Sequence, residues 1–361
     1  DRILDSLRSK GFTKDEFQVL EALLLGKKQD LSYEVMTNYQ NAGAMHLLAI
    51  SGLHIGILLM ILNFVLKPLE RFRHGITVKL ILLLIGLWGF AFLSGLSPSV
   101  IRAVFMFTVL SIGLYSGRKN NLGHYLFTAL FISLLINPRY LFDLGFQLSY
   151  VAVASIIVIS PLIKSLWTPN HKILKYFWNL LAISFSAQIG ILPLGLYYFH
   201  QFSAVFFVSS LCIIPFLGVI LGMGYLMFIL NYFDHLPAFY ISTFSWMISA
   251  MNQIIEILGS LNYLIFQGTF FTFLLLWISY LLLISSITWI KTKAVKWLIA
   301  SFFFIILLLT ALLIEKGLTQ TSAGFIVFHR YKQSSIVKRV GHRGVVYSNL
   351  GDENPLRHRV A

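Results

Sequence analysis

The chain has 361 residues, of which 57% are hydrophobic and 12% are charged, against roughly 25% charged residues in an ordinary soluble domain. These values exclude a soluble globular protein, a disordered chain and a coiled coil, and they predict an all-α polytopic membrane protein. The formal net charge is +14. The single cysteine, Cys212, excludes a disulfide within the chain and a cysteine-based metal site.

A transmembrane helix needs about 20 mostly apolar residues, and apolar runs of this kind fill the middle of the chain. We expect about ten transmembrane helices, within a range of nine to eleven. The fourth run is short for a span. In chain order the expected spans are residues 44–66, 76–94, 98–116, 122–136, 144–166, 174–198, 203–231, 237–258, 269–290 and 295–314.

Two of these runs are open to another arrangement. Pro215 lies within 203–231 and could divide this run into a re-entrant half-helix and a span. The run 237–258 is amphipathic and could lie in the membrane interface instead of crossing the bilayer. Its apolar stripe consists of Ile241, Phe244, Ile248, Met251, Ile255 and Leu258, and its polar face of Ser245, Ser249, Asn252 and Glu256.

The short loops between the expected spans differ sharply in positive charge. With ten spans, one set of loops holds twelve Lys and Arg residues, and the opposite set holds only Arg139. Short loops rich in Lys and Arg favour the cytoplasmic side of a membrane. We therefore expect both termini to lie on the extracytoplasmic side.

The two ends of the chain differ in composition from the apolar segment 44–314. Residues 1–43 carry mixed charges, and we expect a soluble or amphipathic helical lead-in there. The segment 315–361 is a short basic tail. Apolar and β-branched residues at 324–328, 336–340 and 345–347, with a turn-like run at 341–344, predict a β-hairpin-like structure in this tail.

The first expected span, 44–66, contains a group of polar residues. His46, Ser51 and His54 interrupt an otherwise apolar run, and Ser51 and His54 share a helix face because they are three residues apart. A polar group at membrane depth needs a partner or a water-filled cavity. The group favours the lining of a hydrated path, but each histidine could instead bond to a neighbouring helix or lie at the interface.

Arg102 lies one turn into the third expected span. Ser97 suits the capping position of this helix, and Pro98 suits its first turn. Arg102 could hold a phosphate near a helix N-terminus, where the helix dipole also favours anions. Two alternatives stay open for this side chain, an interface anchor and an ion pair with Asp143 or Glu256.

Further hydrogen-bonding residues lie in the fifth and sixth expected spans. Gln147 and Ser149 follow the start of the fifth span, and Gln188 lies in the sixth. Pro193 should kink or break the sixth helix. These polar residues fit either a cavity lining or hydrogen bonds between helices.

Other sequence features concern packing or exclude chemistry. Gly218 and Gly222 form a G-x-x-x-G pair, which predicts close helix packing. The sequence has no zinc-protease motif, no clustered metal ligands and no Walker-type phosphate loop. We therefore expect no cofactor and no metal.

Several motifs, in order along residues 44–203, resemble the ComEC competence family. The most specific is the run HLLAISGLH from His46 to His54. The others are Ser97-Pro98-Ser99 with Arg102-Ala103, the run from Leu144 to Val153, Gln188-Ile189-Gly190 with Leu192-Pro193-Leu194, and Phe199-His200-Gln201-Phe202-Ser203.

The resemblance implies a channel domain of the inner (plasma) membrane that passes single-stranded DNA into the cytoplasm during natural transformation. Its expected partners are single-stranded DNA, the lipid bilayer, other DNA-uptake proteins and a second copy of the chain. The residues that would line the path are His46, Ser51, His54, Arg102, Gln147, Ser149 and Gln188. In the tail, DNA could contact Lys332, Lys338, Arg339 and Arg343.

Two other classes of function stay open from the residues alone. One is a secondary transporter of a small anionic solute, which would bind it near broken helices. The other is an intramembrane hydrolase, with Ser51 as nucleophile and His46 or His54 as base, for which the sequence offers no third orienting group. The tail carries no metal-hydrolase motif, so we expect that the chain is not an enzyme.

Overall fold

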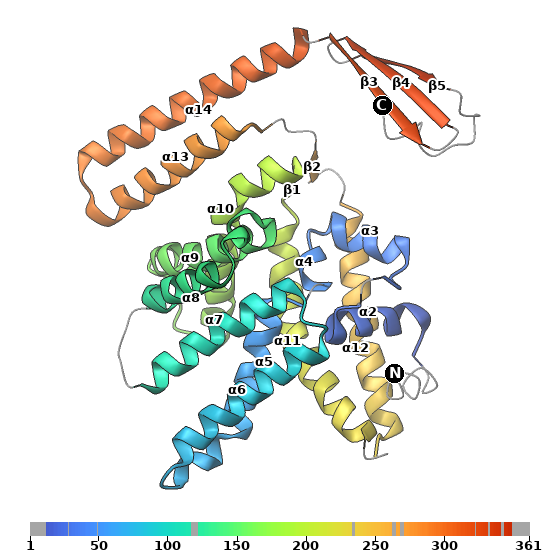
Figure 1. Ribbon diagram of the computed structural model, residues 1–361, viewed down its shortest axis with the longest axis vertical. Coiled ribbons are helices and arrows are strands. Elements are labelled where there is room, and N and C mark those ends of the chain that lie inside the picture. The colour runs from blue at the N-terminus through green and yellow to red at the C-terminus, as the bar shows by residue number, and fades with distance from the viewer. Residues whose placement is uncertain are drawn as a thin grey trace. The chain divides into compact units, whose positions relative to one another are not determined.

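The computed structural model describes the backbone of residues 12–27, 29–48, 50–116, 122–232, 235–261, 265–267, 271–321, 323–330, 333–340 and 343–348. Side chains are described within these ranges as far as Gly317, except those of His46, Ile229, Tyr232 and residues 265–267. The chain divides into two compact units, Asp1–Gly195 with Gln201–Thr269, and Leu196–His200 with Phe270–Ala361. Figure 1 shows the elements of both units.

One hydrophobic core of the first unit combines helices from the start of the chain with helices from residues 206–259. Here α2 (Lys14–Leu25), α3 (Tyr33–Asn41) and α4 (Met45–Leu48) pack with α11 (Phe206–Tyr232) and α12 (Ala238–Gly259), as Figure 1 shows. The lead-in helices are thus part of the core and share it with two apolar helices from much later in the chain.

The sequence of α2 explains both its start and its burial. Thr13 Oγ1 accepts a hydrogen bond from the Glu16 backbone N–H, and the Glu16 carboxylate accepts one from the Thr13 N–H at 3.0 Å. This reciprocal capping box satisfies two backbone donors that the first helical turn leaves without partners. Gly26, with φ 75°, ends the helix in the left-handed conformation that glycine adopts at low cost.

The predicted apolar stripe of α12 faces this core. Phe244, Ile248, Met251 and Ile255 are all buried there. The polar face is used as well, because Asn252 Oδ1 accepts a hydrogen bond from the Tyr39 hydroxyl at 2.9 Å. Burial raises the pKa of Tyr39 above its ordinary value, since the phenolate would lose its hydration.

A second core lies between α5 (Gly52–Val65), α6 (Gly75–Leu93) and α7 (Pro98–Tyr115). The turn between α5 and α6 contains a short 3-10 helix, η1 (Lys67–Arg71), and an ion pair joins its exposed Glu70 to the buried Lys79 of α6. Lys79 Nζ lies 2.5 Å from Glu70 Oε1 and holds the pKa of Glu70 below its ordinary value. The stability that this pair adds is therefore present above the ordinary pKa and is lost as the pH falls through the lowered value.

The remaining helices of the first unit follow in sequence order. They are α8 (Leu122–Ile136), the 3-10 helix η2 (Pro138–Phe142), α9 (Leu144–Lys164) and α10 (Lys172–Phe199). α7 contacts α8 and α9, and α8 contacts α9. A short antiparallel pair, β1 (Gln201–Ser203) with β2 (Ile265–Gln267), connects distant segments of this unit.

The second unit contains a helical hairpin and a small sheet. Within the hairpin, Ser301 Oγ donates to Ser285 Oγ at 3.2 Å, and Thr272 bonds to Glu315. The sheet is antiparallel in the order β3-β4-β5, in the part of the tail for which the sequence predicts β-structure. The elements are α13 (Phe273–Thr292), α14 (Val295–Thr321), β3 (Ala323–Arg330), β4 (Gln333–Val340) and β5 (Arg343–Ser348).

Seven of the described helices are long and apolar enough to cross a membrane, fewer than the ten expected. They are α6, α7, α9, α10, α11, α13 and α14. The apolar helices α5 and α8 have only 14 and 15 residues, and amphipathic α12 is not among the seven. The fold is that of an all-α membrane protein, and of these three helices only α5 is much shorter than its expected span, 44–66.

Three local expectations need correction. α10 and α11 continue through Pro193 and Pro215, so neither proline breaks its helix. A Cβ on Gly218 would meet no atom within 4 Å, and one on Gly222 would make only ordinary contact with Ile61 at 3.9 Å. The close approach on α11 is instead at Gly224, where a Cβ would lie 2.6 Å from the methyl groups of Leu24.

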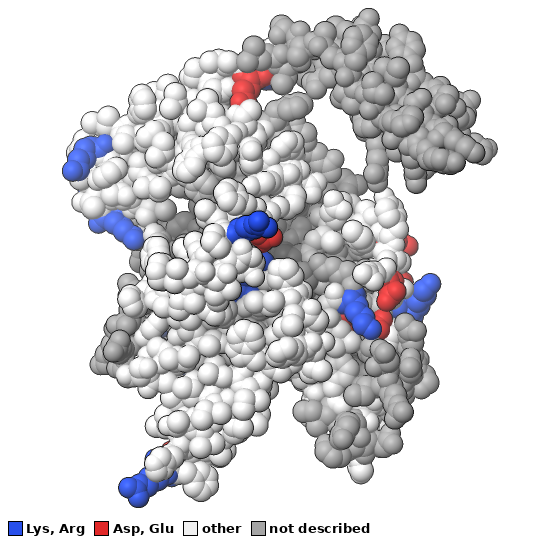
Figure 2. Space-filling view, viewed as in Figure 1, with Lys and Arg blue, Asp and Glu red and all other residues white. Residues whose placement is uncertain are grey.

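The surface is the reverse of that of a soluble protein. Phe64 and Leu93 are 78% and 80% exposed, and many other large apolar side chains lie on the outside of the helices. Among the residues that the structure describes, Figure 2 shows charged side chains at only a few isolated places on this face. Such a surface is suited to contact with lipid, where apolar side chains lose nothing by exposure.

Gly190 allows a close contact between α10 and α9, and this can be tested. A Cβ at Gly190 would lie 1.8 Å from Ser155 Oγ and 2.4 Å from Ser155 Cβ. We expect Gly190→Ala to destabilise the protein by roughly 1–3 kcal/mol, because the two helices must separate. The measurement is the thermal unfolding midpoint in detergent.

Gly195→Ala on the same helix is the matched control, because a Cβ there would meet no atom within 4 Å. The double variant Gly190→Ala/Ser155→Gly should recover most of the loss. Equal midpoints for the variants at 190 and 195 would contradict the close contact.

Candidate functional site

The first candidate region is a break in the first expected span. The sequence predicts a continuous helix over 44–66, but α4 ends at Leu48 and α5 begins only at Gly52. Between them, Ser51 has an extended backbone, with φ −123° and ψ 175°. The polar residues of the HLLAISGLH run therefore lie where a helix begins, and not along the face of a continuous one.

Ser51 and His54 form a compact capping arrangement at this break. The Ser51 backbone N–H points to His54 Nδ1 at 3.4 Å, and Ser51 Oγ lies 3.1 Å from the same nitrogen. An acceptor three residues into a helix that reaches back to the N-cap N–H satisfies a donor that the helix leaves without a partner. His54 is fully buried, so this polar contact replaces water that the side chain cannot reach.

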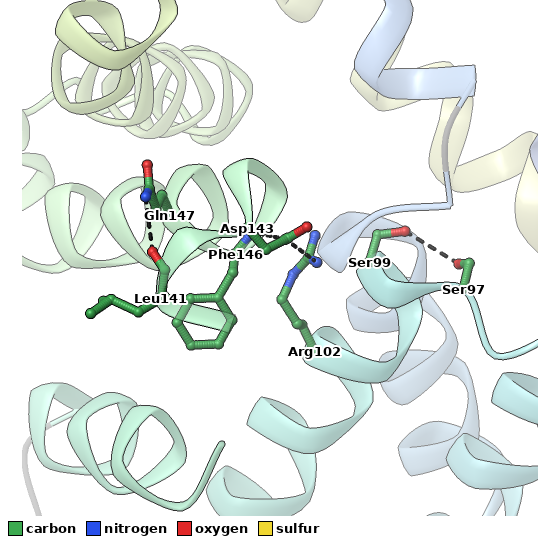
Figure 3. A network of polar contacts seen from close by, with 7 residues as sticks. All are labelled: Ser97, Ser99, Arg102, Leu141, Asp143, Phe146 and Gln147. Carbon is green, nitrogen blue, oxygen red and sulfur yellow. Dashed lines mark hydrogen bonds and ion pairs between the residues drawn. The ribbon is translucent and has the colours of Figure 1, made fainter. Parts of the chain in front are cut away.

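The second candidate region joins the first turns of α7 and α9, as Figure 3 shows. Arg102 Nη1 donates to Asp143 Oδ1 at 3.3 Å, which decides between the alternatives for Arg102 in favour of an ion pair with Asp143. The same oxygen accepts the Phe146 N–H at 2.7 Å, so Asp143 also caps α9. Ser97 and Ser99 lie near this network at the start of α7, with their hydroxyls 3.3 Å apart.

The guanidinium of Arg102 is largely buried and incompletely bonded. Its side chain is 12% exposed, against 47% for that of Asp143. Arg102 Nε is buried and has no hydrogen-bond partner among the described residues. A cation in such surroundings attracts anions more strongly than one in water, because the local dielectric constant is lower.

Glycine at position 145 makes room for this arrangement. A Cβ on Gly145 would lie 2.8 Å from Arg102 Nη2 and 3.3 Å from Asp143 Oδ1. The guanidinium therefore lies against the bare backbone of the first turn of α9. The close packing of Gly145 against the Arg102–Asp143 pair therefore explains these three residues without any need for a ligand.

The other predicted path residues are dispersed. Gln147 Nε2 donates to the Leu141 carbonyl at 2.8 Å, back toward η2. Ser149 and Gln188 are half-buried on α9 and α10. The side chain of His46 lies outside the described residues, as do those of the predicted DNA-contact residues in the tail, Lys332, Lys338, Arg339 and Arg343.

The helices that carry these motifs are neighbours. α5 contacts α7, and α7 contacts α9. Gly56 on α5 lies against the Phe107 ring of α7, since a Cβ there would be 3.3 Å from the ring. The structure thus places the break at Ser51 and the Arg102 network on adjacent helices of one unit.

Two clefts of about 430 and 390 Å³ lie elsewhere in the described part of the chain. The larger is lined by residues of α12 and by Glu16, whose carboxylate accepts a hydrogen bond from Ser245 Oγ at 2.8 Å. The smaller is lined by residues between Leu69 and Val78. Neither contains a predicted path residue.

Sequence reasoning missed Glu16 because residues 1–43 were expected to lie outside the membrane domain. Two signals were available. Thr13 and Glu16 have the spacing of a capping box, which marks a helix start. The serines of α12 recur on one face and require hydrogen-bonding partners when they are packed against another helix.

The helices, the lipid-facing surface and the two polar regions define a multi-pass membrane protein with polar groups at the starts of internal helices. The chain belongs to the competence protein family, whose profile matches residues 23–293. This match confirms the resemblance read from the ordered motifs.

Three curated relatives are similar to parts of this chain. ComE operon protein 3 of Bacillus subtilis (strain 168) is 35% identical over 202 residues, which are 56% of this chain and 25% of the relative. The uncharacterized protein YcaI of Escherichia coli (strain K12) is 24% identical over 206 residues, 55% of this chain and 27% of the relative. An uncharacterized protein of Aquifex aeolicus (strain VF5) is 32% identical over 139 residues, 38% and 32% of the two chains.

The matched segments thus span about a quarter to a third of the length of these relatives. No solved structure matches the chain.

The two roles of Asp143 can be separated by substitution. Asp143→Ala removes both the α9 cap and the charge, whereas Asp143→Asn keeps a capping side chain. We expect Asp143→Ala to be less stable than Asp143→Asn by about 1 kcal/mol in thermal unfolding. Equal stability of the two variants would show that the Phe146 contact contributes nothing measurable.

Proposed function

We propose that this chain forms the membrane channel domain through which single-stranded DNA passes into the cytoplasm during DNA uptake in natural transformation. Membership of the competence protein family supports this role. The relative from Bacillus subtilis is a product of the ComE operon, but the chain matches only a quarter of it. The activity of the whole relative is therefore part of the proposal.

The observation that carries the proposal is the buried guanidinium of Arg102, whose Nε has no hydrogen-bond partner among the described residues and whose Nη1 makes a long contact to Asp143. DNA is a chain of phosphates, and arginine binds phosphate with paired N–H donors. A strand that must move needs sites that attract phosphate without holding it. One partly satisfied arginine provides such a site, whereas a continuous basic groove would trap the strand.

We further propose that the chain lies in the inner membrane with both termini extracytoplasmic, an arrangement in which α5, α8 and α12 cross the bilayer together with the seven longer helices. The basis is the charge of the connections between helices. The α5–α6 turn carries Lys67, Arg71 and Arg73, and Lys291 and Lys293 lie at the end of α13 and just after it. Positive charge in short connections favours the cytoplasmic side. Other DNA-uptake proteins and a second copy of the chain are the proposed partners.

The role of Arg102 is tested by DNA import. We expect Arg102→Gln to reduce the internalisation of labelled DNA roughly tenfold, because a charge-assisted contact to phosphate is lost. The measurement is nuclease-resistant label in cells that carry the substitution in their own copy of the protein. Arg139→Gln is the control, since Arg139 is an exposed arginine of η2.

The amount of protein in the membrane is measured in parallel by immunoblot. Normal import by Arg102→Gln at normal protein level would contradict a phosphate contact at this residue. Loss of the protein from the membrane would instead assign Arg102 a purely structural role.

A second candidate, an intramembrane hydrolase, is favoured by one contact, the 3.1 Å distance between Ser51 Oγ and His54 Nδ1. The same nitrogen also faces the Ser51 backbone N–H, which is the geometry of a helix cap. A serine nucleophile further needs an oriented base and an oxyanion site. We therefore propose that the pair caps the start of α5 and that the chain is not an enzyme.

A serine-reactive fluorophosphonate probe separates these two functions. We expect no labelling of the purified protein, because a serine that caps a helix is not activated. Labelling that disappears in Ser51→Ala would establish the hydrolase instead. The small-anion transporter would be supported if saturable uptake of a small anion depended on Arg102.

A further inference from the structure

Asp143 performs two tasks with a single oxygen atom. Its Oδ1 accepts the Phe146 N–H at 2.7 Å and the Arg102 Nη1 donor at 3.3 Å. The first contact is a short, well-formed helix cap. The second is longer than the roughly 2.7–2.9 Å that is usual between a guanidinium and a carboxylate. The cap therefore fixes the position of the carboxylate, and the ion pair adapts to it.

The two members of the ion pair differ in access to water. The Asp143 side chain is 47% exposed and that of Arg102 is 12% exposed. A carboxylate with this exposure can exchange the guanidinium for water at little cost, whereas the buried guanidinium needs an anion beside it. Another anion can therefore replace Asp143 beside Arg102, whereas Arg102 stays in place.

The guanidinium also has donor capacity that Asp143 does not use. Arginine has five N–H donors in a planar fork, and Arg102 Nε is buried with no partner in the described part of the chain. Gly145 lets the fork pack directly against the backbone of α9, because a Cβ there would come within 2.8 Å of Nη2. A phosphate has enough oxygen atoms to pair with two N–H groups of the guanidinium at once, whereas Asp143 Oδ1 accepts a hydrogen bond from one of them, Nη1.

We propose that Asp143 is a resident counter-ion that occupies Arg102 between phosphates and is displaced by each phosphate of a passing strand. This inference rests on the proposed function. With Asp143 bound, Arg102 never becomes a bare buried cation, and with phosphate bound, Asp143 keeps its contact to Phe146. Competition by Asp143 lowers the affinity of Arg102 for phosphate and returns the site to its starting state after each step.

The choice of aspartate agrees with this role. Asparagine and serine cap helices about as well as aspartate does, so capping alone does not require a charge at position 143. A neutral cap would leave Arg102 without an anion. The charge of Asp143 is therefore the property to remove in a test, and the cap is the property to keep.

The test measures binding of a fluorescent oligothymidylate to the purified chain in lipid nanodiscs. We expect Asp143→Asn to bind the oligonucleotide roughly three- to tenfold more tightly, because the competing carboxylate is gone. Asp143→Ser, a second neutral cap, should behave in the same way. Asp30→Asn removes one charge from an exposed turn and should change the affinity less than twofold.

The proposal requires that the tighter oligonucleotide binding of Asp143→Asn depends on Arg102. In the Arg102→Gln background, Asp143→Asn should therefore have no effect on affinity, which a double-mutant cycle measures. Tighter binding by Asp143→Asn should also come with slower DNA import, because each phosphate is released more slowly.

Two results would overturn the proposal while leaving the proposed function in place. One is unchanged or weaker binding by Asp143→Asn together with weaker binding by Arg102→Gln, which would make Asp143 only a positioning residue for Arg102. The other is a gain in affinity that persists without Arg102. If Arg102→Gln also binds as the unmodified chain does, the phosphate contact of the proposed function fails as well.

Discussion

Polar groups inside this protein have to find their partners within the chain, because lipid offers none, and this requirement shapes both candidate regions. At the break between α4 and α5, His54 supplies the acceptor that the Ser51 N–H needs. At the start of α9, Asp143 supplies one to Phe146. In both cases the residue that suggests function also completes a helix end. In this chain the two motifs therefore specify where helices begin as much as they supply polar groups for a transport path.

The sequence allowed the position of most apolar helices to be predicted, because hydropathy reports burial in lipid directly. The helices α6, α7, α9 and α13 begin and end within about four residues of the expected spans. The break at Ser51 was not predicted, because polar residues within the run 44–66 are also compatible with a continuous membrane helix that packs them against a neighbour. At Pro193 and Pro215 the sequence suggested breaks, but both helices continue. A long apolar helix tolerates the missing hydrogen bond when neighbouring helices hold it in place.

The sequence indicated which residues belong to the candidate site, but it did not indicate which contacts they make with one another. Hydropathy singles out Arg102 and Asp143 because charges are costly in an apolar segment. Which acid pairs with Arg102 depends on how α7 and α9 pack, and the sequence left Asp143 and Glu256 equally open. The role of Gly145 could not be predicted for the same reason, because it depends on how closely the Arg102 guanidinium approaches the backbone of α9. Tertiary packing thus supplied the information that separates an ion pair from an isolated cation.

The burial of α2 has a practical consequence for dissecting the protein. Glu16 and the apolar residues that follow it are enclosed by α11 and α12, which arise some two hundred residues later in the chain. A fragment designed from hydropathy alone would start near residue 44 and would leave the inner side of α12 uncovered. Shortened versions of this protein should therefore retain the lead-in helices, and a fusion partner is better attached ahead of Thr13 than between α3 and α4.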